Sequence, residues 1–307
     1  MRTFRIGIVN FCLTAGFPIG TLFGGIILKK LGYYGSYSIA GSLHLVNFLY
    51  TTFFLKDPVR TKEQKEHDKK GIWSFFRTFF DWTNIRDSVM FVFKSGPKYR
   101  RLRMITLLIV QFMLFGPFYG ELAIMYISTR YRFNWDEVKY SIFQTYNFVL
   151  HTIGTIFSIT VLSKLLQWHD SALGILSTMS KVLASFIYGL AANEKIFYIG
   201  PVAEIFNGMG LLAVKSIVSK LVNPDELGKV NSVFSLVENA SPLIYVPIYT
   251  KVYTATMEVL PGAVFLMGSV MSFPAIVAFS FFWYKYKKAS RRLGEEAPSI
   301  IIPVQER

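Results

Sequence analysis

Eight hydrophobic segments, each long enough to cross a lipid bilayer, constrain this chain more than any other feature. A helix needs about 20 apolar residues to cross a hydrocarbon core of about 30 Å. A soluble core does not need so many runs of this length, and 52% of the residues are hydrophobic. We therefore predict an all-α, multi-pass membrane protein. The predicted spans are residues 8–28, 34–55, 103–128, 138–163, 171–191, 196–218, 230–254 and 262–284.

A long basic loop divides these spans into a group of two and a group of six. A transporter built of two six-helix halves carries its long cytoplasmic loop between the halves. The simplest interpretation is such a protein without its first four helices, with Met1 as an internal start. The predicted parts are the last two helices of the N-terminal half (1–55), a cytoplasmic basic loop (56–102), a complete C-terminal six-helix bundle (103–284) and a cytoplasmic tail (285–307). Within the loop, residues 71–92 are predicted to form an amphipathic segment.

The net charge of +14 fits membrane topology better than nucleic-acid binding. Most of the 33 Lys and Arg residues lie in the loop, the tail and the other segments predicted on one side of the bilayer. The positive-inside rule makes that side cytoplasmic, so both termini are predicted to be cytoplasmic. No nucleic-acid-binding motif accompanies the charge, and we expect no nucleic-acid partner. The plasma membrane and the endolysosomal membrane both remain open.

Three glycines recur every four residues in the first span and flatten one face of that helix. Small residues at this spacing let a neighbouring helix approach closely. Two interpretations remain open, namely ordinary helix packing and a sliding contact between transporter halves. The three are Gly16, Gly20 and Gly24.

Four ionisable side chains fall in the middle third of their predicted spans, counted at about 1.5 Å per residue. A charge in hydrocarbon is costly, so each of these groups requires a partner or a water-filled cavity. Glu121 and Lys215 lie nearer the ends of their spans and are expected to reach the interface. The four deeper groups are His151, Lys181, Glu204 and Glu238.

Other polar residues share a helix face with these groups in three of the spans. Such stripes are typical of helices around a central aqueous cavity, whereas the last span, without an ionisable residue between 262 and 283, suits a supporting position. The stripes are Gln144, Asn147, His151, Thr155 and Ser158; Glu204, Asn207 and Lys215; and Asn231, Ser235 and Glu238.

Each polar group also has a structural interpretation. An intramembrane Asn can simply form an interhelical hydrogen bond, which stays open for Asn147, Asn207 and Asn239. Lys181 is expected on a peripheral helix, where an ion pair or a local water defect is favoured over substrate contact; if it faces inward instead, it would help Lys215 to attract an anion. The sequence contains no phosphate-binding loop, no paired-His metal spacing and no recognisable Ser/His/Asp set, so no enzyme, metal site or cofactor is predicted.

Two stretches support a resemblance to a known family. They are RTFRIGIVNFCLTAGFPIGTLFGGIILKKLGYYG, at the first span, and VKSIVSKLVNPDELGKVNSVFSLVENASPLIYVPIYTKVYTATMEVLPGAVFL. Both resemble the proton-coupled folate transporter family, solute carrier family 46, within the major facilitator superfamily. The resemblance spans nearly the whole chain and aligns it with helices five to twelve. It implies a twelve-helix fold in two halves, alternating access and proton-coupled uptake of organic anions such as folates, steroid conjugates, cyclic dinucleotides or peptidoglycan fragments.

The resemblance also implies some site residues. An arginine in the tenth helix of the folate-transporting member corresponds to Lys215, which keeps the charge but not the bidentate geometry. The family's seventh-helix histidine falls near Leu114, and no Glu or Asp occupies residues 7–28, where its fifth-helix acid would lie. These departures argue against folate as the substrate.

The sequence therefore predicts a secondary active transporter, a proton-coupled symporter of a small organic anion; the alternative is a non-transporting membrane receptor or scaffold. Its partners would be that anion, protons, the lipid bilayer and the missing N-terminal helices of the same protein. His151, Glu204 and Glu238 are expected to share one cavity. The proton-coupling candidates are Glu238, Glu204 and His151, and the substrate-binding candidates are Lys215, Asn147, Gln144, Asn231 and Asn207.

Overall fold

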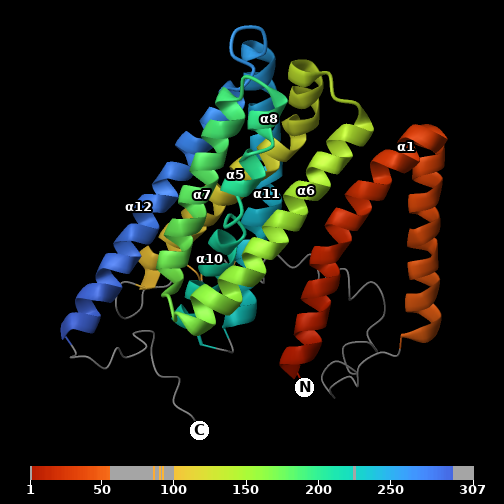
Figure 1. The fold of residues 1–307 in the computed structure, drawn as a ribbon. Helices are drawn as coiled ribbons and strands as arrows, with labels where there is room; N and C mark the ends of the chain where they lie inside the picture. Colours follow the sequence, from red (N-terminus) through yellow and green to blue (C-terminus); the bar gives the residue numbers. More distant parts are fainter. Residues whose placement is uncertain are drawn as a thin grey trace.

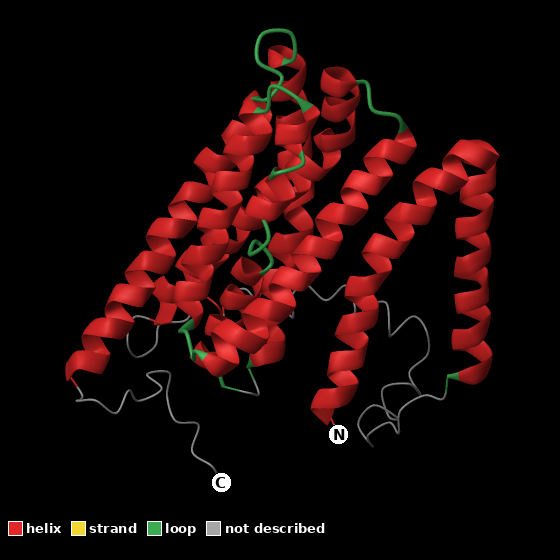
Figure 2. Cartoon of the chain, viewed as in Figure 1, coloured by secondary structure: helices red, strands yellow, loops and turns green. Residues whose placement is uncertain are grey.

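The computed structural model describes residues 2–55, 86, 90, 92, 100–223 and 226–292, and the side chains of 16–288 within that set. This part of the chain is helical, with short loops between the helices and no strand (Figure 2). The all-α prediction is confirmed. The predicted amphipathic segment at 71–92, apart from Arg86, Met90 and Val92, lies outside the described residues, as does the tail beyond residue 292.

The first helical element, α1 (Arg2–Phe54), is bent at Gly32 into two legs. Gly32 has φ 68° and ψ −173°, which a glycine adopts without the steric cost of a side chain. The two legs run in opposite directions (Figure 1). They correspond to the first two predicted spans, and the bend falls in the predicted gap between them.

The other helices are joined by short connections, and all are long except α8 and α9, which have four residues each. Three of them begin at side chains that accept backbone hydrogen bonds: Asp136 from the Lys139 amide at 2.8 Å, His169 from the Ser171 amide at 3.2 Å and Asn193 from the Ile196 amide at 3.0 Å. The elements are α5 (Arg100–Phe133), α6 (Glu137–Phe157) with its π-helical continuation η2 (Ser158–Leu165), α7 (Asp170–Leu190), α8 (Glu194–Phe197), α9 (Gly200–Ala203), α10 (Met209–Leu221), α11 (Leu227–Thr256) and α12 (Ala263–Arg292).

Successive segments alternate in direction across the bundle (Figure 1). The bend of α1, the α5–α6 connection and the α11–α12 connection lie at one end, and the start of α1 and the end of α12 lie at the other. Four of the described helices are long and apolar enough to cross a membrane by length and composition alone. They are Arg100–Phe133, Glu137–Leu165, Asp170–Leu190 and Ala263–Lys288.

The predicted span at 196–218 is wrong as a continuous helix, because the chain forms α8, α9 and α10 with residues 204–208 in turns between α9 and α10. Pro201 lacks an amide hydrogen, and glycines follow at positions 208 and 210. Hydroxyls of α7 replace some of the lost helical bonds: Ser180 donates to the Ala203 carbonyl at 2.5 Å and Ser177 to the Asn207 carbonyl at 2.6 Å. A broken helix inside a bundle is tolerated only with such partners.

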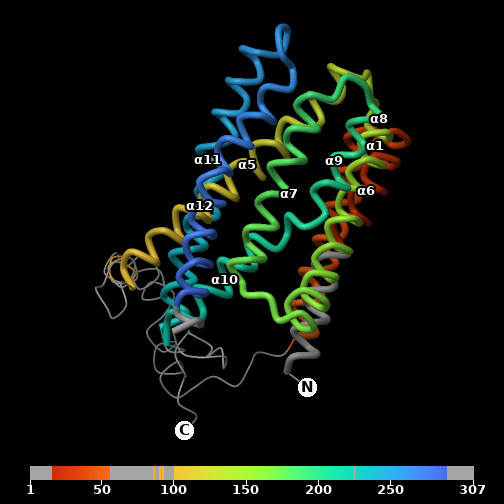
Figure 3. Tube along the Cα trace, turned by 60° about the vertical axis from the view of Figure 1, so that its left-hand side comes forward, coloured from red at the N-terminus to blue at the C-terminus, as the bar shows by residue number. Residues whose placement is uncertain are grey.

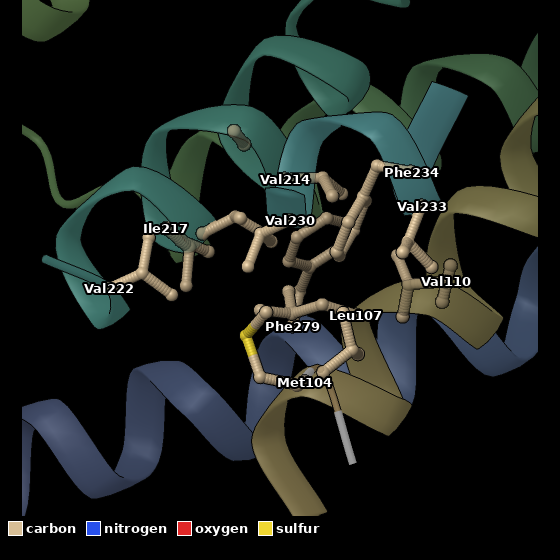
Figure 4. Packing of buried hydrophobic residues seen from close by; sticks show 14 residues of the cluster. Met104, Leu107, Val110, Val214, Ile217, Val222, Val230, Val233, Phe234 and Phe279 are labelled. Carbon is tan, nitrogen blue, oxygen red and sulfur yellow. The ribbon is translucent and has the colours of Figure 1, made fainter. Parts of the chain in front are cut away.

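Three apolar clusters hold the described helices together, the smallest of them formed by Leu162, Leu173 and Met209. In the first, buried side chains of α5, α10, α11 and α12 interlock (Figure 4), among them Leu107, Val214, Val230 and Phe279. The second is rich in aromatic residues and joins α5, α6, α7, α8, α11 and α12 around Tyr188. The turned view separates α5, α11 and α12 from α6 and α1 (Figure 3). The broken α8–α10 segment and α7 link the two sides.

The packing role expected of Gly16, Gly20 and Gly24 is not found among the described residues, because a Cβ at each would meet no atom within 4 Å. α1 instead contacts α6 through Gly25, where a Cβ would overlap Ser141. The Ser141 hydroxyl donates to a backbone carbonyl of α1, that of Thr21. The close approach uses the glycine beside the stripe, on a different face of the helix.

Candidate functional site

A cavity of about 490 Å³ lies where α1, α5, α6, α7 and the turns after α9 meet. Its wall is part aromatic and part polar, which is typical of sites for small amphipathic molecules. Three of the polar side chains are charged in their usual states. The lining residues are Phe17, Phe118, Tyr119, Glu121, Leu122, Met125, Gln144, Asn147, Phe148, His151, Thr152, Lys181, Glu204 and Asn207.

The first part of the polar stripe predicted on α6 lines this cavity, and the second part does not. Gln144, Asn147 and His151 line the cavity. Farther along, Thr155 instead packs against the broken helix, where a Cβ on Gly208 would overlap its hydroxyl. The same glycine lets the imidazole of His151 lie beside the turns that contain Glu204, since that Cβ would be 2.9 Å from Nε2.

One wall of the cavity is a buried ionic cluster from three helical segments. The Lys181 ammonium on α7 donates to Glu121 Oε2 on α5 at 2.6 Å and to Glu204 Oε1 after α9 at 2.8 Å. The three side chains are 6%, 3% and 9% exposed. Two carboxylates and one ammonium, all ionised, give the cluster a net charge of −1. Such a charge is expensive to bury unless further hydrogen bonds satisfy the carboxylate oxygens.

Neutral side chains supply some of these bonds. Asn207 Nδ2 donates to Glu204 Oε1 at 2.8 Å, and the Tyr188 hydroxyl donates to Oε2 at 3.3 Å. Glu121 has a weaker set, with a single further bond from Ser185 at 3.4 Å among the described residues. Glu204 is therefore the better satisfied of the two carboxylates.

The structure corrects two sequence predictions at this cluster. Glu121 does not reach the interface, because α5 extends to Phe133 and places the residue deep in the bundle. Lys181 is not on a supporting helix without cavity access, since it lines the cavity; its predicted ion pair is confirmed. Sequence reasoning missed Glu121 as a site residue and gave Lys181 a role in attracting the anion only if it faced inward. The signal available was the continuation of the third helical pattern past residue 128.

Glu238 is not among the residues that line this cavity, so the expectation that it shares one with His151 and Glu204 is wrong for Glu238. It lies 3.6 Å from Lys215, in an ion pair whose side chains are 28% and 55% exposed. Lys215 and Asn231 are likewise absent from the lining, while Asn207 belongs to it. The predicted candidates thus divide into a cavity group and an α10–α11 group.

Within the described residues, no group of three or more His, Cys, Asp or Glu side chains is arranged to hold a metal ion. The chemistry that this arrangement supports is proton exchange at carboxylates and imidazole, and hydrogen bonding through amides. The aromatic rings add surface for apolar rings of a bound molecule.

A family model described as Major Facilitator Superfamily matches residues 1–239. Curated relatives are solute carrier family 46 proteins, which confirms the resemblance seen in the sequence. One, the lysosomal proton-coupled steroid conjugate and bile acid symporter SLC46A3 of Mus musculus, is 27% identical over 90% of this chain and 58% of its own length.

Two further relatives are likewise similar to this chain over only part of their own length. The SLC46A3 symporter of Gallus gallus is 24% identical over 87% of this chain and 56% of its own length. The probable peptidoglycan muropeptide transporter SLC46 of Drosophila melanogaster is 21% identical over 62% of this chain and 38% of its own length. The chain thus spans less than two thirds of the length of the curated relatives that it matches.

Proposed function

Because the chain belongs to the Major Facilitator Superfamily, we propose that it is the part of a secondary active transporter that contains a substrate cavity and the groups that exchange protons. The proposed reaction is symport of a small organic anion with protons. Residues 1–55 are assigned to the end of one transporter half and residues 103–284 to the other.

One observation supports this proposal most directly: an ionic cluster of two carboxylates and one ammonium group, which do not balance, borders a cavity inside a bundle of membrane-spanning helices. Ionisable groups at such depth are costly and mark ion or substrate pathways. The neighbouring helix is broken where it borders the cavity, between Ala203 and Met209. Discontinuous helices at a binding site are a recurring feature of secondary transporters.

The proposed roles follow the two groups of residues. Glu204 and His151 exchange protons, because both line the cavity. Gln144, Asn147 and Asn207 bind polar parts of the substrate by hydrogen bonds. In the α10–α11 group, Glu238 is a weaker candidate for proton exchange, and Lys215 and Asn231 are candidates for attracting an anion at a cavity mouth.

The substrate class is an amphipathic organic anion with a rigid apolar body. Phe17 and Phe148 stack with ring centroids 5.4 Å apart at the contact of α1 with α6, and both line the cavity. Flat rings of this kind suit a fused-ring body, such as that of the steroid conjugates and bile acids named for the mammalian relatives. The cytoplasmic side is assigned to the end of the bundle that holds the start of α1 and the end of α12.

Uptake into vesicles tests the proposal. The complete product of the gene is reconstituted, and entry of labelled estrone sulfate is measured with and without an inward proton gradient. A transporter accumulates the compound against its concentration gradient only when the proton gradient is present. A receptor or scaffold binds it without accumulation, and that result would reject the proposal.

A further inference from the structure

The charge of the buried cluster depends on how many protons it holds. We propose that Lys181 is the group that binds the anionic part of the substrate, and that protons make it available by neutralising Glu121 and Glu204. This proposal rests on the proposed transport function and names the switch at the same cavity.

In the unprotonated cluster, Lys181 is already engaged. An ammonium group has three hydrogens to donate, and the two carboxylates take two of them. The net charge of −1 repels an anion at short range in a site shielded from water. An organic anion is therefore excluded from this wall of the cavity while both carboxylates are ionised.

Each proton taken up changes the balance by one charge. A proton on one carboxylate brings the cluster to zero, and a second leaves the ammonium charge without a counter-ion. A monovalent anion then restores neutrality beside Lys181, which lines the cavity. The loaded state holds two protons and one anion. After release of the anion on the other side, loss of both protons returns Lys181 to Glu121 and Glu204.

The geometry distinguishes this cluster from the other ion pairs of the described residues. Exposed pairs such as Lys139–Glu194, with side chains 44% exposed, are screened by water and have little influence on binding. Glu121 and Lys181 are 3% and 6% exposed, so water screens them far less. Only a buried charge can alter anion affinity strongly.

Other titratable groups face the cluster and have to be separated from it. They are His151 from α6, Tyr188 from α7 and Tyr249 from α11, while α12 contributes Gly268. Phenols stay neutral from mildly acidic to neutral pH, because their unperturbed pKa is about 10. His151 is thus the remaining group among these that could add a pH dependence of its own, and His151→Gln isolates its contribution.

Direct binding to the purified complete protein tests the switch. Estrone sulfate is the anionic probe and estrone the matched neutral probe, and the sulfate stays ionised throughout the pH range used. For wild type, the affinity for the sulfate should rise as the pH falls, by about tenfold per pH unit for each proton taken up. Estrone binding should change little.

The carboxylate variants carry the decisive comparison. Glu204→Gln should reduce by one the number of protons taken up with each anion, so that affinity depends less steeply on pH. The double variant Glu121→Gln with Glu204→Gln should bind the sulfate independently of pH. At neutral pH the double variant should exceed wild-type affinity about tenfold or more, because Lys181 is no longer neutralised. A third substitution, Lys181→Gln, should then abolish the preference for the sulfate over estrone.

Controls make the outcomes separable. Lys220→Gln removes an exposed ion pair with Asp170 and should bind like wild type; thermal unfolding confirms that each variant is folded. If Glu204→Gln and the double variant keep the full wild-type slope, the switch is rejected, whereas proton-driven uptake in vesicles would still support the transport function. If wild type shows no proton-driven uptake, the transport function itself fails.

Discussion

Gly268 of α12 leaves the space that the carboxylate of Glu121 occupies. A Cβ at position 268 would overlap Glu121 Oε1 and would lie 3.0 Å from the Tyr249 hydroxyl. The last helix therefore shapes the charged wall of the cavity although none of its side chains is ionisable at that depth. Its contribution is the absence of a side chain.

Gly268→Ala should destabilise the protein by about 1–3 kcal/mol, because the added methyl group must displace a buried charged group or shift α12. Gly228→Ala is the matched control, since a Cβ there would meet nothing within 4 Å. In a helix that change is expected to stabilise by about 0.5–1 kcal/mol. Thermal unfolding of both variants in detergent measures the contrast, and equal unfolding temperatures would contradict the assigned crowding.

A second pair of glycines tests how α1 attaches to α6. Gly25→Ala should loosen this contact, because the new Cβ would overlap Ser141, whose hydroxyl also bonds to α1. Gly24→Ala adds the same methyl group where nothing lies within 4 Å. Disulfide trapping between cysteines introduced at Thr21 and Thr145, whose hydroxyls are 3.1 Å apart, reports the contact. The trapping rate should fall for position 25 and stay unchanged for position 24.

Hydropathy predicted most of the helices because burial in lipid requires long apolar runs, and it placed the gap between the first two spans at the Gly32 bend. It failed at residues 196–218, where the helix is broken. There the hydroxyls of Ser177 and Ser180 donate to backbone carbonyls that have lost their helical hydrogen bonds. Such support comes from another helix and has no signature in the local sequence.

The site was predictable only as far as a single helix could show it. Periodicity brought Gln144, Asn147 and His151 to one face, and all three line the cavity. The pairing of Glu121 with Lys181 could not be predicted, because the two residues are 60 positions apart and meet only through the packing of α5 near α7. Depth alone could not decide which of Glu204 and Glu238 faces that cluster.

Removal of the buried ammonium should cost more than removal of the whole cluster. Lys181→Met leaves Glu121 and Glu204 buried without a cation, and breaking such a pair typically costs about 3–5 kcal/mol. Combining Lys181→Met with Gln at both acidic positions should recover most of that loss. Unfolding temperatures of the single and triple variants give the answer, and a triple variant less stable than the single one would contradict this view of the cluster.

An acidic side chain at the start of α8, Glu194, should give the stability a pH dependence outside the membrane. Hydrogen bonds from the Lys139 ammonium and the Trp135 indole hold the pKa of Glu194 below its usual range. A lowered folded-state pKa means that the stabilisation is present above the unfolded value of about 4.3 and is lost as the pH falls through the folded value.

Glu194→Gln should therefore lower stability by a constant amount above about pH 4.3 and remove one component of the loss of stability on acidification. The measurement is the unfolding temperature of wild type and variant as the pH is lowered from neutral. Asp170→Asn, which alters an ion pair at the opposite end of α7, serves as a control for general charge effects. Parallel curves for wild type and Glu194→Gln would show that these hydrogen bonds do not affect stability.

Two glutamates of similar predicted depth should differ in their effect on proton coupling. Glu204 is enclosed beside the cavity with Lys181 and Asn207, whereas Glu238 is partly exposed and pairs with the half-exposed Lys215 at 3.6 Å. In vesicles containing the complete protein, Glu204→Gln should reduce the response of uptake to a proton gradient about tenfold or more, since one cluster carboxylate no longer titrates. Glu238→Gln should change that response less than about threefold, because Glu238 does not line the cavity and has no contact with Lys181 among the described ion pairs. Exchange of labelled for unlabelled substrate without a gradient confirms that each variant still binds and turns over, and the reverse ranking of the two variants would move the proton-coupling role to the α10–α11 group.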